Sequence, residues 1–293
     1  MNFSTKYLYR SAGIGDVLWT EPILKELAKT NKKVVLFTQF KELFNNYPLT
    51  NVRVRNIPPG WKRSLLKLMN LLSNRQTYHK LDGIYEARPK MHILHAYQQY
   101  FSLPVKDEYP VLYLDTEEKK PIEGLPKDYV VLHLDANVPL NYRKIYGVDW
   151  NEVVSYLRSK NLPVVLTGNY HEPLRDAILF KGSIRQLIQL ISNCRFFIGV
   201  DSGPSHIAAS LHKPSLIFFG SVNPEFRHFP GLFKGYFLQQ PCEYAGCYHE
   251  VISGRGQPCR LVGDEGIPKC SVHTTEYVTR YIDLLMEKRW RVK

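Results

Sequence analysis

The sequence predicts an α/β fold with parallel sheets, and three observations lead to this class. Short apolar runs alternate with helix-compatible stretches along most of the 293 residues, as expected for strands joined by crossover helices. A polar, glycine-bearing turn directly follows two of these runs, one early and one late in the chain. A charged, proline-bearing segment at 115–127 is typical of a linker. We therefore expect two domains, residues 1–125 and 126–293.

The apolar pattern predicts each element of the first domain. Apolar runs predict five strands, at 7–9, 34–37, 52–54, 83–85 and 111–114. A helix is expected over 17–28, because Leu18, Ile23, Leu24 and Leu27 can share one apolar face there.

The second domain alternates strand and helix more regularly. Apolar runs predict strands at 129–134, 163–167, 196–200 and 215–219. Helical patterns lie between and after them, at 150–159, 187–191, 207–211 and 275–288. Thr274 or Thr275 is a suitable cap for the last helix.

The composition is that of a globular protein, with 44% hydrophobic and 23% charged residues. No apolar run approaches the roughly 20 residues that cross a bilayer. Residues 1–10 lack the long apolar centre of a signal peptide. We expect a cytoplasmic protein, either free or at the inner face of the membrane.

Positive charge is concentrated in the first domain. The chain has 39 basic and 27 acidic residues, a formal net charge of +12, and its basic residues cluster between Arg53 and Lys90, where only Asp82 and Glu86 oppose them. Such a field recruits an anionic partner, which can be a phosphorylated glycolipid, an anionic membrane face or nucleic acid. The alternative is a solvated surface that only aids solubility. The helix-like stretch at 62–72 is either a membrane contact or a core helix with a basic edge.

The late turn has the pattern of a phosphate site. The apolar run at 196–198 leads into Asp201-Ser202-Gly203, and a helix-compatible segment follows. Ser202 and Gly203 would leave backbone N–H groups free at the helix start, where anions bind. Asp201 would accept hydrogen bonds from hydroxyl groups, so the turn suggests a sugar nucleotide. The alternative is that these residues only cap the helix.

The early turn is Gly13-Ile14-Gly15-Asp16, again between a strand and a helix. Leu18 stands where the dinucleotide-binding fingerprint needs a third glycine, and the chain has no Gly-Lys-Ser/Thr phosphate loop. Asp16 is either a helix cap or a general base that faces the cleft between the domains.

The two turns carry a family resemblance. Gly13-Ile14-Gly15-Asp16-Val17, followed by Pro22-Ile23-Leu24, resembles the opening of glycosyltransferase family 9, the heptosyltransferase-like enzymes. Asp201-Ser202-Gly203-Pro204 with His206-Ile207-Ala208-Ala209 resembles the donor-site motif of that family. Pro214, Gly220 and Pro224 continue the match, as do Gly168 and Glu172.

The resemblance implies a GT-B fold, in which two Rossmann-like domains face a cleft. The first would bind the acceptor and the second the sugar nucleotide, an ADP-heptose-like donor. Transfer would invert the anomeric carbon without a catalytic metal. The acceptor would be anionic, such as a lipopolysaccharide-type core, with modified DNA or a protein side chain as alternatives. An alternative of another class is a non-catalytic nucleic-acid-binding protein on a degenerate transferase fold. No pattern indicates the oligomeric state.

The same resemblance implies residue roles. Asp16 would be the catalytic base, and Lys144, or Arg143 at a register shifted by one, the cation on the phosphates. Donor contacts would come from Gly168, Glu172, Asp201, Ser202, Gly203 and His206, of which His206 alternatively only packs the helix. Acceptor contacts are expected from Gly15, Arg63 and Lys67.

Four cysteines cluster in a loop at 242–270: Cys242, Cys247, Cys259 and Cys270. In a cytoplasmic protein such density favours a structural metal, zinc or iron, over disulfides. Four, eleven and ten residues separate them, unlike the short spacing of common zinc sites, so reduced thiols or a disulfide remain alternatives. His249 is a lesser candidate ligand. The autotransporter heptosyltransferases are similar in having a four-cysteine iron-binding finger. Cys194, in an apolar context, is expected to be a buried hydrophobe.

Overall fold

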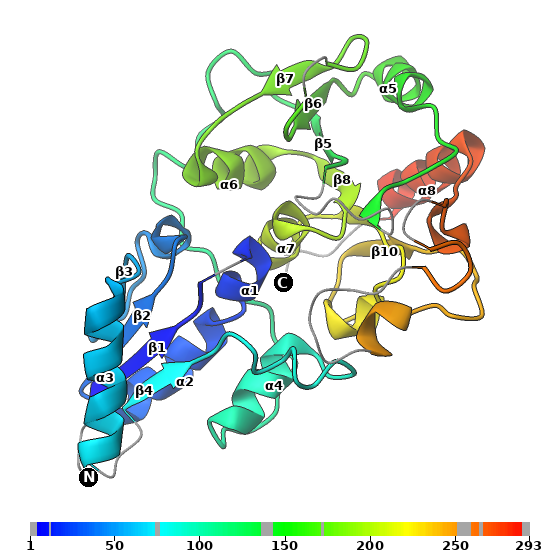
Figure 1. The fold of residues 1–293 in the computed structure, drawn as a ribbon. Coiled ribbons are helices and arrows are strands. Elements are labelled where there is room, and N and C mark those ends of the chain that lie inside the picture. The colour runs from blue at the N-terminus through cyan, green and yellow to red at the C-terminus, as the bar shows by residue number, and fades with distance from the viewer. Residues whose placement is uncertain are drawn as a thin grey trace.

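Two parallel sheets, one in each half of the chain, confirm the α/β class. The structure is a computed structural model that describes residues 5–11, 13–73, 77–135, 143–170, 173–250, 259–263 and 266–288. We call the part up to Tyr100, which contains the first sheet, the N-lobe. The part from Val130, which contains the second sheet, is the C-lobe. Figure 1 shows the two lobes side by side.

The N-lobe sheet has the strand order β3-β2-β1-β4, with every pair parallel. Its strands are β1 (Thr5–Tyr9), β2 (Lys33–Phe37), β3 (Val52–Arg55) and β4 (Tyr78–Lys80). The connecting helices are α1 (Ile14–Leu18), α2 (Glu21–Thr30), the short η1 (Lys41–Phe44), α3 (Gly60–Ser73) and α4 (Ile93–Tyr100). Tyr9 pairs with Phe37 and Lys80, so the carboxyl ends of these three strands lie at one edge.

The C-lobe sheet has the order β10-β9-β8-β5-β6-β7 and is also parallel. Its strands are β5 (Val130–His133), β6 (Val164–Thr167), β7 (Ile178–Phe180), β8 (Phe196–Val200), β9 (Ser215–Phe218) and β10 (Gly235–Leu238). Its helices are α5 (Trp150–Ser159), α6 (Ile184–Asn193), α7 (Gly203–Ser210) and α8 (Thr275–Glu287), with short 3-10 turns η3 (Pro224–Phe226), η4 (Cys247–Glu250) and η5 (Lys269–Ser271).

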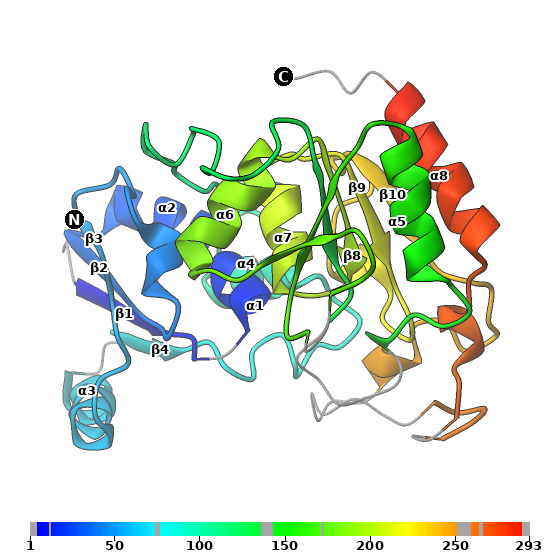
Figure 2. The same cartoon turned by 90° about the horizontal axis from the view of Figure 1, so that it is seen from above.

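Helices cover both faces of the C-lobe sheet, which explains its continuous apolar strands. On one face, Phe196 and Ile198 pack with Val153 of α5 and Val278 of α8. On the other, Phe197 packs in a core that includes residues of α6 and α7. Figure 2 shows α5 and α8 together on one side, and α6 and α7 on the side that faces the N-lobe.

The same hydrophobic core continues into the N-lobe. It contains Leu8, Leu24 and Leu36 as well as Ile207 and Ala208 of α7. Helices α1 and α7 lie side by side in both ribbon views, at the junction of the lobes (Figures 1 and 2). The two sequence turns therefore meet at one place in the fold.

Three elements expected for the first domain differ from the structure. The helix expected over 17–28 is two helices, because the chain turns at Trp19 and Thr20, where the Thr20 hydroxyl donates to the Val17 carbonyl at 2.7 Å. The strand expected at 83–85 is a turn with Gly83 at a φ of 92°, and the fourth strand lies earlier, at β4. The segment 111–114 joins no sheet, because its Val111 N–H donates to the buried Glu21 carboxylate.

The expected domain boundary at 125 lies in the connection between α4 and β5. The described residues 101–129 contain no helix or strand. The strands and helices predicted for the C-lobe are present, and the structure adds the strands β7 and β10, which the sequence pattern did not predict. The division into an acceptor and a donor domain stays a prediction. None of the helices in the described part of the chain combines the length and the apolar character that a membrane crossing needs.

Candidate active site

Asp201 lies at the carboxyl end of β8, where the sequence places the donor turn. Its side chain is 4% exposed, and its N–H donates to the Phe218 carbonyl at 3.0 Å. Arg143 holds the turn from outside the strand. It donates to the Asp201 carbonyl at 3.0 Å, and its guanidinium lies 3.6 Å from the Asp201 carboxylate. The structure thus brings two of the predicted donor residues into direct contact.

The start of α7 offers fewer free amides than the sequence suggested. The Ser202 N–H donates to the Ser205 hydroxyl at 3.2 Å, and that hydroxyl donates back to the Ser202 carbonyl at 2.7 Å. Pro204 has no N–H. The Gly203 N–H makes no hydrogen bond to a described residue, so it is the donor of this turn that stays open to an anion.

Asp16 lies at the start of the N-lobe, on α1, with its side chain 29% exposed. Its Oδ2 accepts from Arg10 at 2.7 Å. Arg10 is only 2% exposed and also donates to Glu86 at 2.9 Å, while Asp82 lies 3.6 Å away. Burial works to lower the pKa of Arg10, but Tyr97, Asp16, Tyr85 and Glu86 outweigh it and raise that pKa. Asp16 therefore faces a permanently charged guanidinium.

Sequence reasoning missed Arg10, Asp82 and Glu86. The available signal was position, because Arg10 directly follows β1 at the carboxyl edge of the sheet, and Asp82 and Glu86 follow β4. They interrupt the basic stretch, and in the fold they surround the Arg10 guanidinium.

His206 joins the two turns across the lobe boundary. A Cβ on Gly15 would lie 2.3 Å from the His206 ring, and a Cβ on Gly203 would lie 2.7 Å from Ile14. Both glycines therefore let α1 and α7 approach closely. Gly15 is buried in this contact, which gives a packing reason for the residue; its predicted acceptor role stays a prediction.

His206 is held in its neutral form. Burial lowers the pKa of His206 to about 4, with Asp201 and Asp16 acting in the opposite direction. Its Nδ1 accepts from the Trp19 indole at 3.3 Å, so its Nε2, which lies 3.8 Å from Asp201, carries the proton. The ring stacks on His228 at a centroid distance of 4.6 Å. His206 thus lies within the electrostatic reach of both predicted carboxylates.

Arg227 is the second side chain on which both carboxylates, Asp16 and Asp201, act electrostatically. It is 7% exposed and follows η3 in the C-lobe. Burial works to lower the pKa of Arg227, but nearby groups outweigh it and raise that pKa. Among these groups are Asp201 and Asp16. No motif pointed to Arg227, because nothing in its sequence neighbourhood reveals that it is buried.

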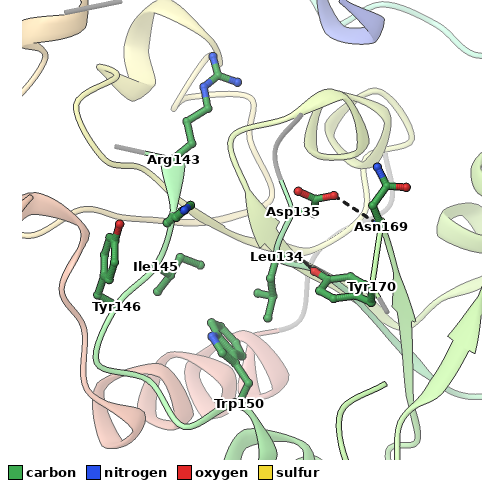
Figure 3. Close-up of a pocket in the computed structure, with 9 residues that line it drawn as sticks. Leu134, Asp135, Arg143, Ile145, Tyr146, Trp150, Asn169 and Tyr170 are labelled. Atoms are coloured by element: carbon green, nitrogen blue, oxygen red, sulfur yellow. Dashed lines mark hydrogen bonds between the residues drawn. The ribbon is translucent and has the colours of Figure 1, made fainter. Parts of the chain in front are cut away.

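A pocket of about 370 Å³ opens beyond the carboxyl ends of β5 and β6. Figure 3 shows Asp135, Asn169 and Tyr170 on one side of it and Arg143, Ile145 and Tyr146 on the other. Lys144, Leu134 and Trp150 complete the lining, and Lys144 is exposed. The pocket combines ring faces, cations and hydrogen-bonding groups, the features that a nucleotide needs.

Gly168 borders this pocket with a φ of 141°, a region that favours glycine. A Cβ there would lie 2.7 Å from the Tyr170 ring and 3.2 Å from Asp135. The predicted donor contact Glu172 lies outside the described residues. The donor roles of these residues stay predictions.

A second pocket, of about 340 Å³, lies at the carboxyl edge of the N-lobe sheet. It brings the predicted acceptor residues Arg63 and Lys67 together with Lys80 and Asp82, and its other lining residues are Tyr9, Gly60, Ser64 and Tyr78. Arg63 donates to the Tyr9 hydroxyl at 3.0 Å. Since Asp82 also lies beside Arg10, this basic pocket adjoins the partner of Asp16.

The four clustered cysteines are neighbours in the fold and form no disulfide. Burial raises the pKa of the Cys270 thiol to about 11, and Cys242, Cys247 and Cys259 act on it in the same direction. Cys194 lies elsewhere, in the core at 2% exposure, as expected. In the described part of the chain, ligand atoms within 4.8 Å of one another are found for Asp201, His206 and His228, whereas the four thiols do not form such a group.

Comparison with known families decides the membership of the chain. The model of glycosyltransferase family 9 (heptosyltransferase) matches residues 40–231, more than half of the sequence. The chain belongs to glycosyltransferase family 9. The match confirms the resemblance and includes the Asp201 turn and every lining residue of the basic pocket except Tyr9. Asp16 and the four cysteines lie outside the matched range.

Two curated relatives agree with this family 9 assignment. Lipopolysaccharide heptosyltransferase 1 of Salmonella typhimurium is 26% identical over 99 residues, which cover 30% of this chain and 29% of the relative. Lipopolysaccharide heptosyltransferase 3 of Escherichia coli is 28% identical over 119 residues, which cover 34% of this chain and 33% of the relative. The matched segments thus span about a third of the length of each relative.

Solved structures of glycosyltransferases share the fold. TibC, an iron-containing dodecameric glycosyltransferase from enterotoxigenic E. coli, has a TM-score of 0.72 at 16% identity, over 97% of this chain and 76% of TibC. It was also solved with ADP-D-β-D-heptose, at 15% identity over 98% of this chain and 78% of that one. The E. coli heptosyltransferase WaaC with ADP has a TM-score of 0.56 at 14% identity, over 97% and 98% of the two chains. The GT-B architecture expected for the chain is therefore confirmed.

Proposed function

We propose that this family 9 member is an inverting glycosyltransferase that moves a sugar from an ADP-heptose-like donor to an anionic acceptor such as a lipopolysaccharide-type core. The observation that carries the proposal is the meeting of the two turns. The His206 ring lies against Gly15, the neighbour of Asp16 in the N-lobe, and its Nε2 lies 3.8 Å from Asp201 of the C-lobe. The names of the relatives support the sugar and the acceptor class, and the bound ligands of TibC and WaaC support ADP.

In the proposed step, Asp16 takes the proton of the acceptor hydroxyl while the hydroxyl oxygen bonds to C1 of the sugar. The bond between C1 and the phosphate oxygen breaks, and its electron pair leaves with the nucleoside diphosphate. Attack from the face opposite the leaving group inverts C1. Arg10 keeps the Asp16 carboxylate oriented through their 2.7 Å contact, and a positioned carboxylate of this kind is a suitable general base.

The donor would occupy the pocket at β5 and β6 and extend toward the start of α7. Trp150 and Tyr146 provide ring faces for the base. The Gly203 N–H and the adjacent cations would meet the diphosphate. Arg143 is anchored on Asp201, while the exposed Lys144 lines the same pocket, so we propose that both reach the phosphates. Asp201 would accept hydrogen bonds from sugar hydroxyls.

The acceptor would bind the basic pocket of the N-lobe. Arg63, Lys67 and Lys80 place three cations around a polar cavity that adjoins the Asp82–Arg10–Asp16 cluster. An anionic group held there would lie beside the proposed base. This arrangement favours an acidic glycan over a neutral one.

Helix α3 supports a peripheral membrane contact for such an acceptor. It exposes Trp61, Leu65 and Leu68, at 62%, 51% and 46%, along one side of the helix. Lys62 and Lys67 lie among them and are exposed as well. Apolar side chains flanked by cations fit the surface of an anionic bilayer. We propose that the protein acts in the cytoplasm at the inner face of the membrane.

A structural metal, zinc or iron, is also part of the proposal. Cys242, Cys247 and Cys259 lie close enough to Cys270 to act on it electrostatically, and four thiols suit either metal. The iron-containing TibC supports iron. The metal would hold a loop that has little core of its own, and the transfer step itself uses none.

The test is to replace Asp16 with Asn and measure transfer from ADP-heptose to a deacylated lipopolysaccharide core. We expect turnover to fall by about 10²- to 10⁴-fold, the usual contribution of a general base. ADP affinity should not weaken, because Arg10 keeps Glu86 and Asp82 as partners and the substitution removes a negative charge near the diphosphate. The exposed Asp115→Asn variant is the control. Unchanged turnover in Asp16→Asn would refute the role of Asp16, and a wild-type chain that transfers from no sugar nucleotide would refute the proposed function.

A further inference from the structure

Arg227 is held between two aromatic rings that come from different parts of the fold. Its guanidinium lies 5.3 Å from the centre of the Tyr85 ring, which belongs to the N-lobe. It lies 5.7 Å from the Tyr248 ring, in the 3-10 turn that begins with Cys247. Such contacts orient a cation without neutralising it.

The charge of Arg227 has no acidic partner among the described residues, because none of their carboxylate oxygens lies within 4.0 Å of the guanidinium. Its Nη1 donates to the Phe226 carbonyl at 3.4 Å. Arg10, which is buried to a similar extent, has three carboxylates around it. An unpaired charge at 7% exposure is costly to fold. The arrangement is therefore suited to an anion that arrives from outside the chain.

Contacts place Arg227 between the two turns. On one side, the Tyr85 ring also lies under Arg10, at 5.2 Å, and Arg10 contacts Asp16. On the other side, the next residue, His228, stacks on His206, whose Nε2 lies 3.8 Å from Asp201. An anion bound to Arg227 would therefore lie between the proposed base, Asp16, and the donor turn at Asp201, where the proposed reaction takes place.

We propose that Arg227 binds the diphosphate of the sugar-nucleotide donor, as a cation additional to Arg143 and Lys144. The inference rests on the proposed function and names a further residue for it. Asp16 and Asp201 both repel a diphosphate, so a cation between them offsets that repulsion. When the bond from C1 to the phosphate oxygen breaks, the electron pair stays on that oxygen, and the fork of the guanidinium can meet it with two hydrogen bonds.

The test compares ligands with and without phosphates. ADP, inorganic pyrophosphate and adenosine are titrated by calorimetry into the full chain, as wild type and as Arg227→Met. We expect Arg227→Met to weaken ADP and pyrophosphate by about 10- to 100-fold, as when a charge-assisted hydrogen bond is lost. Adenosine affinity should stay within about twofold, and the melting temperature should hold or rise, because an unpaired buried charge is removed.

A matched control is Arg260→Met, since Arg260 also lies over a tyrosine ring, at 5.4 Å from Tyr244, but is exposed. Arg227→Lys keeps the charge without the fork, and it should bind ADP with intermediate affinity. If Arg227→Met does not fold, Arg227→Lys decides the matter by the same comparison of ADP with adenosine.

Three results would overturn the inference. Wild-type affinity for ADP in both variants would show that Arg227 does not touch the diphosphate. An equal loss of ADP and adenosine would show a structural role. A wild-type chain that binds neither ADP, UDP, GDP nor pyrophosphate would refute the donor site itself, and with it the proposed function; in the first two cases that function stands.

Discussion

Gly15 and Gly203 lie at the points where the two lobes touch, and each lacks the side chain that would separate them. A Cβ on Gly15 would overlap the His206 ring at 2.3 Å. That ring cannot retreat easily, because Trp19 bonds to it and His228 stacks on it. The residues that a sequence motif marks as functional here also set the distance between the lobes.

We therefore expect Gly15→Ala to lower the free energy of unfolding. Overpacking of a buried contact costs about 1–3 kcal/mol, and the 2.3 Å overlap places this site toward the upper end; the helix preference of alanine returns about 1 kcal/mol, so we expect a net loss of about 2 kcal/mol. Urea unfolding measures it. Gly231→Ala is the control, because nothing lies within 4 Å of a Cβ there. Equal stability of the two variants would show that the lobes adjust at no cost.

At this scale the sequence predicted the groups that lie in motifs and missed those that act through burial. Asp16, Asp201 and His206 stand in recognisable turns, and the fold brings their turns together. Arg10 and Arg227 are candidate functional residues because they are only 2% and 7% exposed and because of the groups around them. A sequence shows that an arginine is present, but it does not show whether a carboxylate, a ring or solvent surrounds it.

Among the elements, α3 presents more apolar surface to solvent than a helix of this lobe needs. Its Trp61 and Leu65 also border a groove of about 680 Å³ with Ile57 and Leu66. Exposed apolar side chains next to cations are typical of helices that lie on a membrane surface. The helix therefore has a role outside the core.

Replacing Trp61 and Leu65 with serine should weaken binding to vesicles of phosphatidylglycerol by about tenfold or more, since each side chain contributes about 1.5–3 kcal/mol when buried. Co-sedimentation measures the bound fraction. Vesicles of phosphatidylcholine and added salt should both reduce wild-type binding, because the cations of α3 lose their partners. Leu284→Ser on α8, where Leu284 is 36% exposed, is the matched control. Vesicle binding that is equal in the double variant and the wild type would contradict a membrane role of α3.

The elements of the C-lobe were predicted better than those of the N-lobe for a physical reason. Strands β5, β6, β8 and β9 are covered on both faces, so their sequences are continuous apolar runs with clear ends. Strand β4 has only three residues and includes His79 and Lys80, while the more apolar 83–85 is a turn at Gly83. Sheet pairing, which a local pattern does not contain, decided between these two segments.

On the scale of the whole molecule, the segment with the cysteines connects the proposed sites of both lobes. Tyr248, next to Cys247, lies over Arg227, whose other ring contact is Tyr85 of the N-lobe. Ser271, next to Cys270, accepts from the Tyr146 N–H at 3.0 Å, and Tyr146 lines the donor pocket. Disorder of this segment would therefore remove contacts of both the donor pocket and Arg227.

This connection predicts that metal loading and donor binding are linked. Protein purified under reducing conditions should hold about one zinc or iron ion per chain, as a four-cysteine site does. Cys247→Ser and Cys270→Ser should lose most of this metal and lower the melting temperature, because the loop then lacks its main constraint. Both should also weaken ADP binding, through Tyr248 and Tyr146 respectively.

Cys194→Ser, a core substitution away from the cluster, should lower the melting temperature while keeping the metal and the ADP affinity. Elemental analysis, thermal unfolding and calorimetry on the same samples measure the three quantities. Metal-free wild-type protein would refute the metal site, and metal loss with unchanged ADP affinity would show that the cysteine segment and the donor pocket are independent.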